Sequence, residues 1–217
     1  MLAVALGFVA GYVDTVGFVA LFGLFTAHVT GNFVLIGSEL ARSSSNVLLK
    51  LLVFPAFIVA VAFTRMLVLW LERRARAALP AVLVLQLVLL CGFMLCGWAA
   101  SPVREADAPL AMLAGICGAA AMGVQNAAGR LVLAALTPTT VMTGNVTQLV
   151  IDVVDILRGT SDEATRRRSV KYVGPVMAFA LGAIGGAFGY VDAGFAALLL
   201  PIAILAALAF TGRRDTP

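Results

Sequence analysis

The chain alternates long apolar stretches with short polar connectors. The apolar stretches are residues 2–25, 33–40, 51–71, 79–100, 110–136, 141–157, 172–191 and 195–210. A run of about 20 apolar residues is long enough to cross a bilayer as a helix. The pattern therefore predicts an all-α protein, a polytopic membrane helix bundle that forms one membrane domain over residues 1–217.

The composition supports this class. Hydrophobic residues make up 62% of the chain and charged residues 12%, against about 45–50% and about 25% in average proteins, which excludes a soluble globular domain. The net charge of +4 does not indicate a nucleic-acid partner, because the cations lie in the connectors, as they do in cytoplasmic loops of membrane proteins. The three cysteines lie in apolar stretches without metal-ligand spacing, so no metal or cofactor is expected.

Two polar motifs occur twice in the same order, which indicates an internal repeat. The motif G-x-x-[DN]-x-x-G and then T-x-x-x-T-G-N occupy residues 11–17 and 26–32, and again residues 123–129 and 139–145. Further along, Glu39 of the first copy falls opposite Asp152 of the second. We therefore predict two repeats, residues 1–100 and residues 108–212.

The connectors indicate how the two copies are oriented. Connector 72–78 carries three arginines and its counterpart 191–194 no cation, whereas connector 158–171 carries five cations and its counterpart 41–50 two. Inverted copies exchange their charge clusters in this way, because cations collect on the cytoplasmic side. The swap favours two inverted repeats of three spans each. The total number of cations on each side of the membrane does not distinguish this arrangement from a parallel one of eight spans, which gives the same totals.

Inversion requires a short re-entrant element in each copy. Residues 2–25 would cross the bilayer as a helix, residues 26–30 would return extended to mid-depth, and residues 31–42 would form a half-helix. The T-G-N residues would then lie near the midplane and face each other: Thr30, Gly31 and Asn32 with Thr143, Gly144 and Asn145.

A half-helix of this kind is suited to binding a small solute. Its N-terminus presents unpaired N–H groups and a partial positive charge, and Thr30 or Thr143 is a good capping residue. Two such ends, together with Thr139, predict a site for a small polar or anionic solute. The alternative is that the motif only caps two tightly packed short helices.

Ionisable residues inside apolar spans mark function more often than not. Asp14 corresponds to Asn126 in the repeat, and Arg130 corresponds to Phe18. Asp14 and Arg130 are expected to meet at the centre as a gate, a counter-ion pair or a proton-coupling site, or else as a structural ion pair. His28, the single histidine, is either a proton relay or a hydrogen-bonded structural residue.

Small residues recur at four-residue spacing, which is typical of close helix packing in membranes. The sets are Gly7 and Gly11; Ala119, Gly123 and Ala127; Gly182 and Gly186; and Gly185 and Gly189. These faces also offer a surface for a homodimer. No motif of a hydrolase or metalloenzyme is present in the sequence, so we do not expect an enzyme.

The two motif blocks resemble those of a known family. Residues 11–18, 30–32, 123–127, 136–137 and 143–145 are similar to the YoaK-like family of bacterial membrane proteins, and the resemblance covers nearly the whole chain. It implies a multi-pass protein of the bacterial inner membrane and assigns no activity to any residue.

These observations lead to one hypothesis and two alternatives. The first is a small secondary transporter or channel for a small polar or anionic solute. The second is a membrane scaffold or regulatory subunit whose polar residues only hold the bundle together. A membrane-embedded enzyme is the third.

Overall fold

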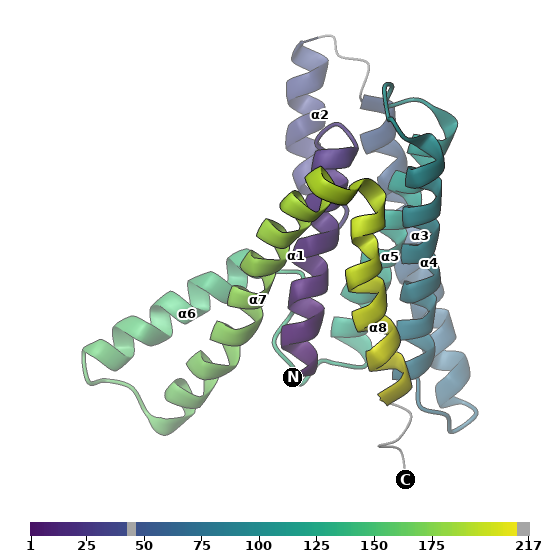
Figure 1. The fold of residues 1–217 in the computed structure, drawn as a ribbon. Helices are drawn as coiled ribbons and strands as arrows, with labels where there is room; N and C mark the ends of the chain where they lie inside the picture. The colour runs from purple at the N-terminus through teal and green to yellow at the C-terminus, as the bar shows by residue number, and fades with distance from the viewer. Residues whose placement is uncertain (43–46, 212–217) are drawn as a thin grey trace.

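The computed structural model describes residues 1–42 and 47–211, and every described element is helical (Figure 1). The α-helices are α1 (Leu2–Ala20), α2 (Gly31–Ala41), α3 (Val47–Glu72), α4 (Leu79–Ala100), α5 (Pro109–Leu131), α6 (Met142–Leu157), α7 (Glu163–Ala193) and α8 (Leu199–Thr211), with the 3-10 turn η1 (Gly194–Leu198) between the last two. Residue 212, which ends the second predicted repeat, lies outside the described residues.

The long helices are apolar enough to cross a membrane. Four of them, α1, α3, α4 and α5, have the length and hydropathy of a span, and a fifth candidate segment, Glu163–Phe210, runs through α7, η1 and most of α8. The chain reverses direction at η1, so that α7 and α8 are antiparallel (Figure 1). The all-helical class predicted from the apolar pattern is therefore confirmed, and the long helices fit the predicted membrane character.

Helices of one half pack mainly on helices of the other. The largest helix contact joins α1 to α7, and α5 packs between α3 and α4. Within the described residues α2 touches only α3, and α6 touches only α7. In Figure 1, α6 and the first part of α7 extend away from the bundle.

Glycines make the contact between α1 and α7 close. A Cβ added to Gly11 would overlap the backbone oxygen of Phe179, and one added to Gly182 or Gly186 would overlap the backbone of α1. The contact between α5 and α3 is looser, because a Cβ on Gly123 would still lie 3.1 Å from the Phe57 oxygen. The packing role predicted for the small-residue faces is confirmed at these positions.

Corresponding helices run in opposite senses in Figure 1. α1 leads away from the end of the bundle at which the N-terminus lies and α5 leads back toward it, and the same reversal relates α3 to α7 and α4 to α8. The contact of α1 with α7 likewise has its counterpart in the contact of α5 with α3. The two halves of the chain thus have related packing.

The segment between α1 and α2 is not extended, although we predicted an extended return to α2. α1 ends at Ala20, and a turn follows in which Phe22 and Gly23 have positive φ angles of 53° and 77°. The return from this turn is not extended, because Gly31 and Asn32 donate backbone hydrogen bonds to the oxygens of His28 and Val29. The α2 helix begins at Gly31, within the residues predicted for the first half-helix.

Candidate functional site

Asp14 fastens the segment that connects α1 to α2. Its side chain is buried on α1, and its Oδ1 accepts hydrogen bonds from the backbone N–H groups of Thr26 and Ala27 at 2.7 and 2.6 Å and from the Thr26 hydroxyl at 3.3 Å. A buried carboxylate needs such partners, and a turn without regular helix bonds leaves N–H groups free to supply them. We call residues 14–32 the first turn unit.

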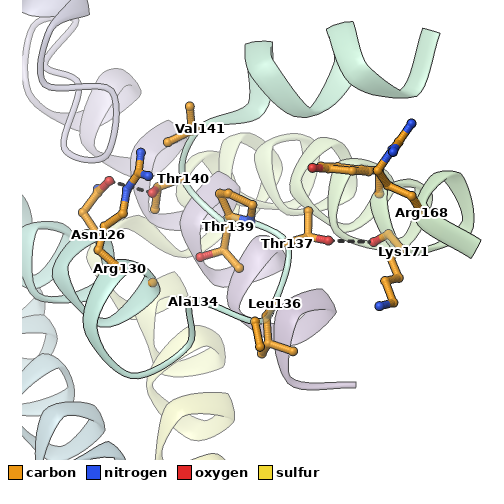
Figure 2. Close-up of a pocket in the computed structure, with 14 residues that line it drawn as sticks. Asn126, Arg130, Ala134, Leu136, Thr137, Thr139, Thr140, Val141, Arg168 and Lys171 are labelled. Carbon is orange, nitrogen blue, oxygen red and sulfur yellow. Dashed lines mark hydrogen bonds between the residues drawn. The ribbon is translucent and has the colours of Figure 1, made fainter. Parts of the chain in front are cut away.

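The second copy repeats this anchor with neutral groups. Asn126 on α5 takes the place of Asp14, and its Oδ1 accepts a hydrogen bond from the Thr140 hydroxyl at 2.7 Å (Figure 2). Gln125 donates to the Thr139 hydroxyl at 2.9 Å. We call residues 126–145 the second turn unit. In both units a polar residue of the G-x-x-[DN]-x-x-G motif thus binds the first threonine of the T-x-x-x-T-G-N motif: Asp14 binds Thr26, and Gln125 binds Thr139.

The asparagines of the two T-G-N sequences close their own turns. Asn32 donates to the Phe25 oxygen at 2.8 Å and accepts from the Phe25 N–H at 3.0 Å. Asn145 donates to the Pro138 oxygen at 2.6 Å, and the second bond is missing because proline has no N–H. Both asparagines are buried, with 0% and 3% of their surface exposed, so their amides serve the turn.

The threonines of T-G-N do not cap the half-helices, contrary to our expectation. Thr30 is the N-cap residue of α2 but makes no side-chain cap bond, and Thr143 lies inside the first turn of α6, which begins at Met142. The segment that leads into each half-helix is held instead by the hydrogen bonds of Asn32 and Asn145, two residues farther along the chain. Thr30, Thr143 and Gly144 are exposed.

A cavity of about 440 Å³ lies beside the second turn unit. It is bounded by the end of α5, the segment 134–141 and the first part of α7 (Figure 2). Its polar and charged lining consists of Asn126, Arg130, Thr137, Thr139, Thr140, Arg168, Lys171 and Tyr172. Among the residues that the structure describes, no acidic side chain lines this basic cavity.

Two of the three cations of the basic cavity are unpaired. Arg168 binds Asp152 of α6 at 2.6 Å, and this hydrogen bond holds the pKa of Asp152 below its usual value, opposed by desolvation. Within the described part of the chain, the side chains of Arg130 and Lys171 make no hydrogen bond or ion pair, and both are exposed. The cavity can therefore offer two uncompensated positive charges to a ligand.

A smaller cavity of about 190 Å³ occupies the equivalent place in the first turn unit. It is lined by Asp14, Thr15, Phe18 and Phe25. Asp14 corresponds to Asn126 and Phe18 to Arg130, so the two cavities share a position in the repeat and differ in charge.

His28 completes the first turn unit. Its Nδ1 lies 2.6 Å from Asp14 Oδ2, and its ring packs edge-on against Phe179 of α7, with ring centroids 5.5 Å apart. The hydrogen bond to Asp14 raises the pKa of His28 above its ordinary value, and burial opposes that rise. Val141 stands at the matching position of the second unit.

The comparison with protein families matches the chain over almost its full length. The family DUF1275, described as a protein of unknown function, matches residues 2–211. The chain belongs to the DUF1275 family. It is also similar to the UPF0700 transmembrane protein YoaK of Bacillus subtilis (strain 168), with 27% identity over 206 residues that cover 94% of this chain and 89% of that protein. No solved structure matches the chain.

The resemblance to YoaK-like proteins is confirmed by these matches, and the structure adds where the candidate residues of this DUF1275 protein lie. Asn126, Arg130 and Thr139 line the basic cavity. Asp14 is paired with His28, and the described residues contain no ion pair between Asp14 and Arg130. The two half-helices do not touch each other, so the T-G-N residues of one copy do not contact those of the other.

Two sets of buried polar residues had not been singled out from the sequence. Gln86 of α4 donates to Gln125 of α5 at 2.7 Å, and Gln125 donates to the Leu6 oxygen at 2.8 Å. Lys50, fully buried, binds Glu39 and the Phe22 oxygen, both at 2.7 Å. The available signals were a polar amide inside an apolar stretch, for Gln86 and Gln125, and an amine at the edge of one, for Lys50.

The Lys50 pair has an equivalent in the second half. Glu39 of α2 binds Lys50 at the start of α3, and Asp152 of α6 binds Arg168 near the start of α7. Each half-helix is therefore tied by an ion pair to the long helix that follows it.

Proposed function

We propose that this protein is a small secondary transporter or channel that moves a small anionic solute across the bacterial inner membrane. It would do so as two inverted repeats of three spans, each with a re-entrant half-helix. The opposite senses of corresponding helices and the exchanged helix contacts support this topology. The arginine-rich connectors 72–78 and 158–171 would face the cytoplasm.

The observation that carries the proposal is the basic cavity. It combines two unpaired cations with the hydroxyl of Tyr172, and none of its described lining residues is acidic, which is the chemistry that favours an anion over a cation. A few polar groups on the wall of a cavity of several hundred Å³ suit a small-molecule ligand. In this proposal Arg130 and Lys171 bind the solute, and the second turn unit forms one wall of its path.

The test is uptake of a panel of small inorganic and organic anions by proteoliposomes. Arg130→Gln and Lys171→Gln should each reduce uptake of the transported anion about tenfold or more, since each removes a charged partner. Arg166→Gln is the matched control, because it removes an exposed arginine of α7 that does not line the cavity. Equal uptake by all variants would remove the cavity from the path.

A membrane scaffold remains the second candidate, and one observation favours it. The T-G-N asparagines are buried, and their side-chain amides form hydrogen bonds within their own turns, as expected of a purely structural motif. Absence of uptake for every anion in the panel, with folded protein in the vesicles, would favour this function. We propose no enzymatic role and no nucleic-acid partner. A homodimer would use a surface other than the glycine faces, because these pack within one chain.

A further inference from the structure

The first turn unit carries an ionisable pair that the second turn unit lacks. Asp14 and His28 lie 2.6 Å apart between α1 and the segment that leads to α2. In the second unit Asn126 and Thr140 hold the equivalent turn with a neutral hydrogen bond, and a valine replaces the histidine. The second unit thus holds its turn without an ionisable pair, which singles out Asp14 and His28 for a role that the second unit lacks.

The bonding pattern divides two tasks between the oxygens of Asp14. Oδ1 is occupied by the N–H groups of Thr26 and Ala27, which stabilise the carboxylate. Oδ2 faces Nδ1 of His28. A histidine whose Nδ1 donates to a carboxylate keeps Nε2 as its basic nitrogen, so the group that gains or loses a proton is the imidazole.

His28 is accessible whereas Asp14 is not. The His28 side chain is 35% exposed and the Asp14 side chain 6%. No described residue forms a hydrogen bond to Nε2 of His28. Nε2 can therefore gain or lose a proton while the contact between Nδ1 and Asp14 is kept.

We propose that Asp14 and His28 form a proton-binding site at the first turn unit, which couples proton movement to the anion movement of the proposed function. On protonation, hydronium gives its proton to Nε2 of His28 and becomes water, and no other bond changes. The carboxylate of Asp14 then faces an imidazolium. Because Asp14 also fastens the turn before α2, the charge state of the pair acts directly on that turn.

Among the described residues, Asp14 is the titratable group that contacts the His28 ring. Phe179 is the aromatic contact that α7 makes with the His28 ring, and η1 and the described part of α8 contain no titratable residue. The remaining titratable residues of the helices packed on α1 are Cys117 and Arg130 on α5; Glu163, Arg166, Arg167, Arg168, Lys171 and Tyr172 near the start of α7; and Tyr190 and Asp192 near its end. On α1 itself, Tyr12 packs against Gly189.

The single histidine makes the site directly measurable without transport. Protein labelled with ¹⁵N-histidine and purified without a histidine tag should give one pair of ring-nitrogen signals, whose pH titration reports His28 alone. We expect Asp14→Asn, which installs the residue of the second copy, to weaken proton binding about tenfold or more, as loss of an adjacent opposite charge does. Asp155→Asn, which removes a carboxylate of α6, is the matched control and should leave the titration unchanged.

Coupling is measured as protons moved per anion in proteoliposomes that contain a pH-sensitive dye. His28→Val should reduce this ratio to near zero. An imidazole that does not titrate, an identical titration in Asp14→Asn, or an unchanged ratio in His28→Val would overturn the proton site. Absence of anion movement in the unmodified protein would instead contradict the proposed function, and the nitrogen titration would still decide the proton site.

Discussion

The two turn units solve the same structural problem with different chemistry. In the first, a carboxylate fastens the turn and an asparagine closes it with two hydrogen bonds; in the second, an amide fastens the turn and the asparagine closes it with one. The first unit borders a small cavity with an acidic residue, and the second borders a larger cavity with cations. Both copies thus have a polar side chain that fastens the turn and an asparagine that closes it, which are the features needed for folding. The carboxylate of the first unit and the cations of the second each occur in one copy only.

The largest effect is expected where the two halves pack most closely. Gly11→Ala places a methyl group against the backbone oxygen of Phe179, which has no flexible end that can move aside. We expect a loss of about 3 kcal/mol in the free energy of unfolding, measured by denaturant titration in micelles. Gly123→Ala, its counterpart, meets atoms at 3.1 and 3.2 Å and should cost about 1 kcal/mol or less, so equal losses would contradict the difference in packing.

Removal of the side chain that fastens each turn should be the next largest effect. Asp14→Ala leaves the N–H groups of Thr26 and Ala27 without their carboxylate and should cost about 3 kcal/mol of stability, because a buried donor left unpaired is expensive. Asn126→Ala removes two neutral bonds, one from the Thr140 hydroxyl and one to the Met122 oxygen, and should cost about 1 kcal/mol, because it leaves no buried backbone N–H group unpaired. The same denaturant titration compares the two, and a reversed order would show that the carboxylate is not the stronger fastening.

The closing asparagines should differ in the same direction but by less. Asn32→Ala loses two hydrogen bonds to Phe25 and Asn145→Ala loses one to Pro138, so we expect losses of about 2 and about 1 kcal/mol. Hydrogen exchange of the backbone amides in segments 24–31 and 137–144 would localise the effect. Unchanged exchange in both segments would indicate that the turns are held by other contacts.

The sequence predicted the elements that depend on local pattern and missed those that depend on distant partners. Apolar runs were enough to locate the spans, and repeated glycines were enough to predict close packing, because both follow from properties of one helix. The start of α2 at Gly31 also followed from the motif. By contrast, the expected meeting of Asp14 with Arg130 was inferred from depth alone, and the structure pairs Asp14 with a histidine of its own turn.

The ion pairs that join each half-helix to the next long helix could not be predicted from local sequence patterns either. Lys50 stands at the edge of an apolar stretch, where cations usually reach toward water, yet it is fully buried against Glu39. The charge of Glu39 opposite Asp152 was visible in the repeat, but their partners were not, since the connector differs in length between the copies. The basic cavity likewise needs α7 to approach the end of α5, which no spacing within one segment reveals.

The smallest effect is expected from pH at the second half-helix. The hydrogen bond from Arg168 holds the pKa of Asp152 below its ordinary value, so the carboxylate is charged at neutral pH and the contribution of the pair to stability is complete there. This contribution declines as the pH falls below about 4, the ordinary range of aspartate, through the lower pKa of the folded state. Acid should therefore loosen the contact of α6 with α7, seen as faster hydrogen exchange in α6, and Asp152→Asn should remove the pH dependence. Because Lys50 and Glu39 hold the first half-helix in the same way but with a fully buried cation, α2 is the internal comparison, and a loosening of α2 with no change in α6 would contradict the assignment to Asp152.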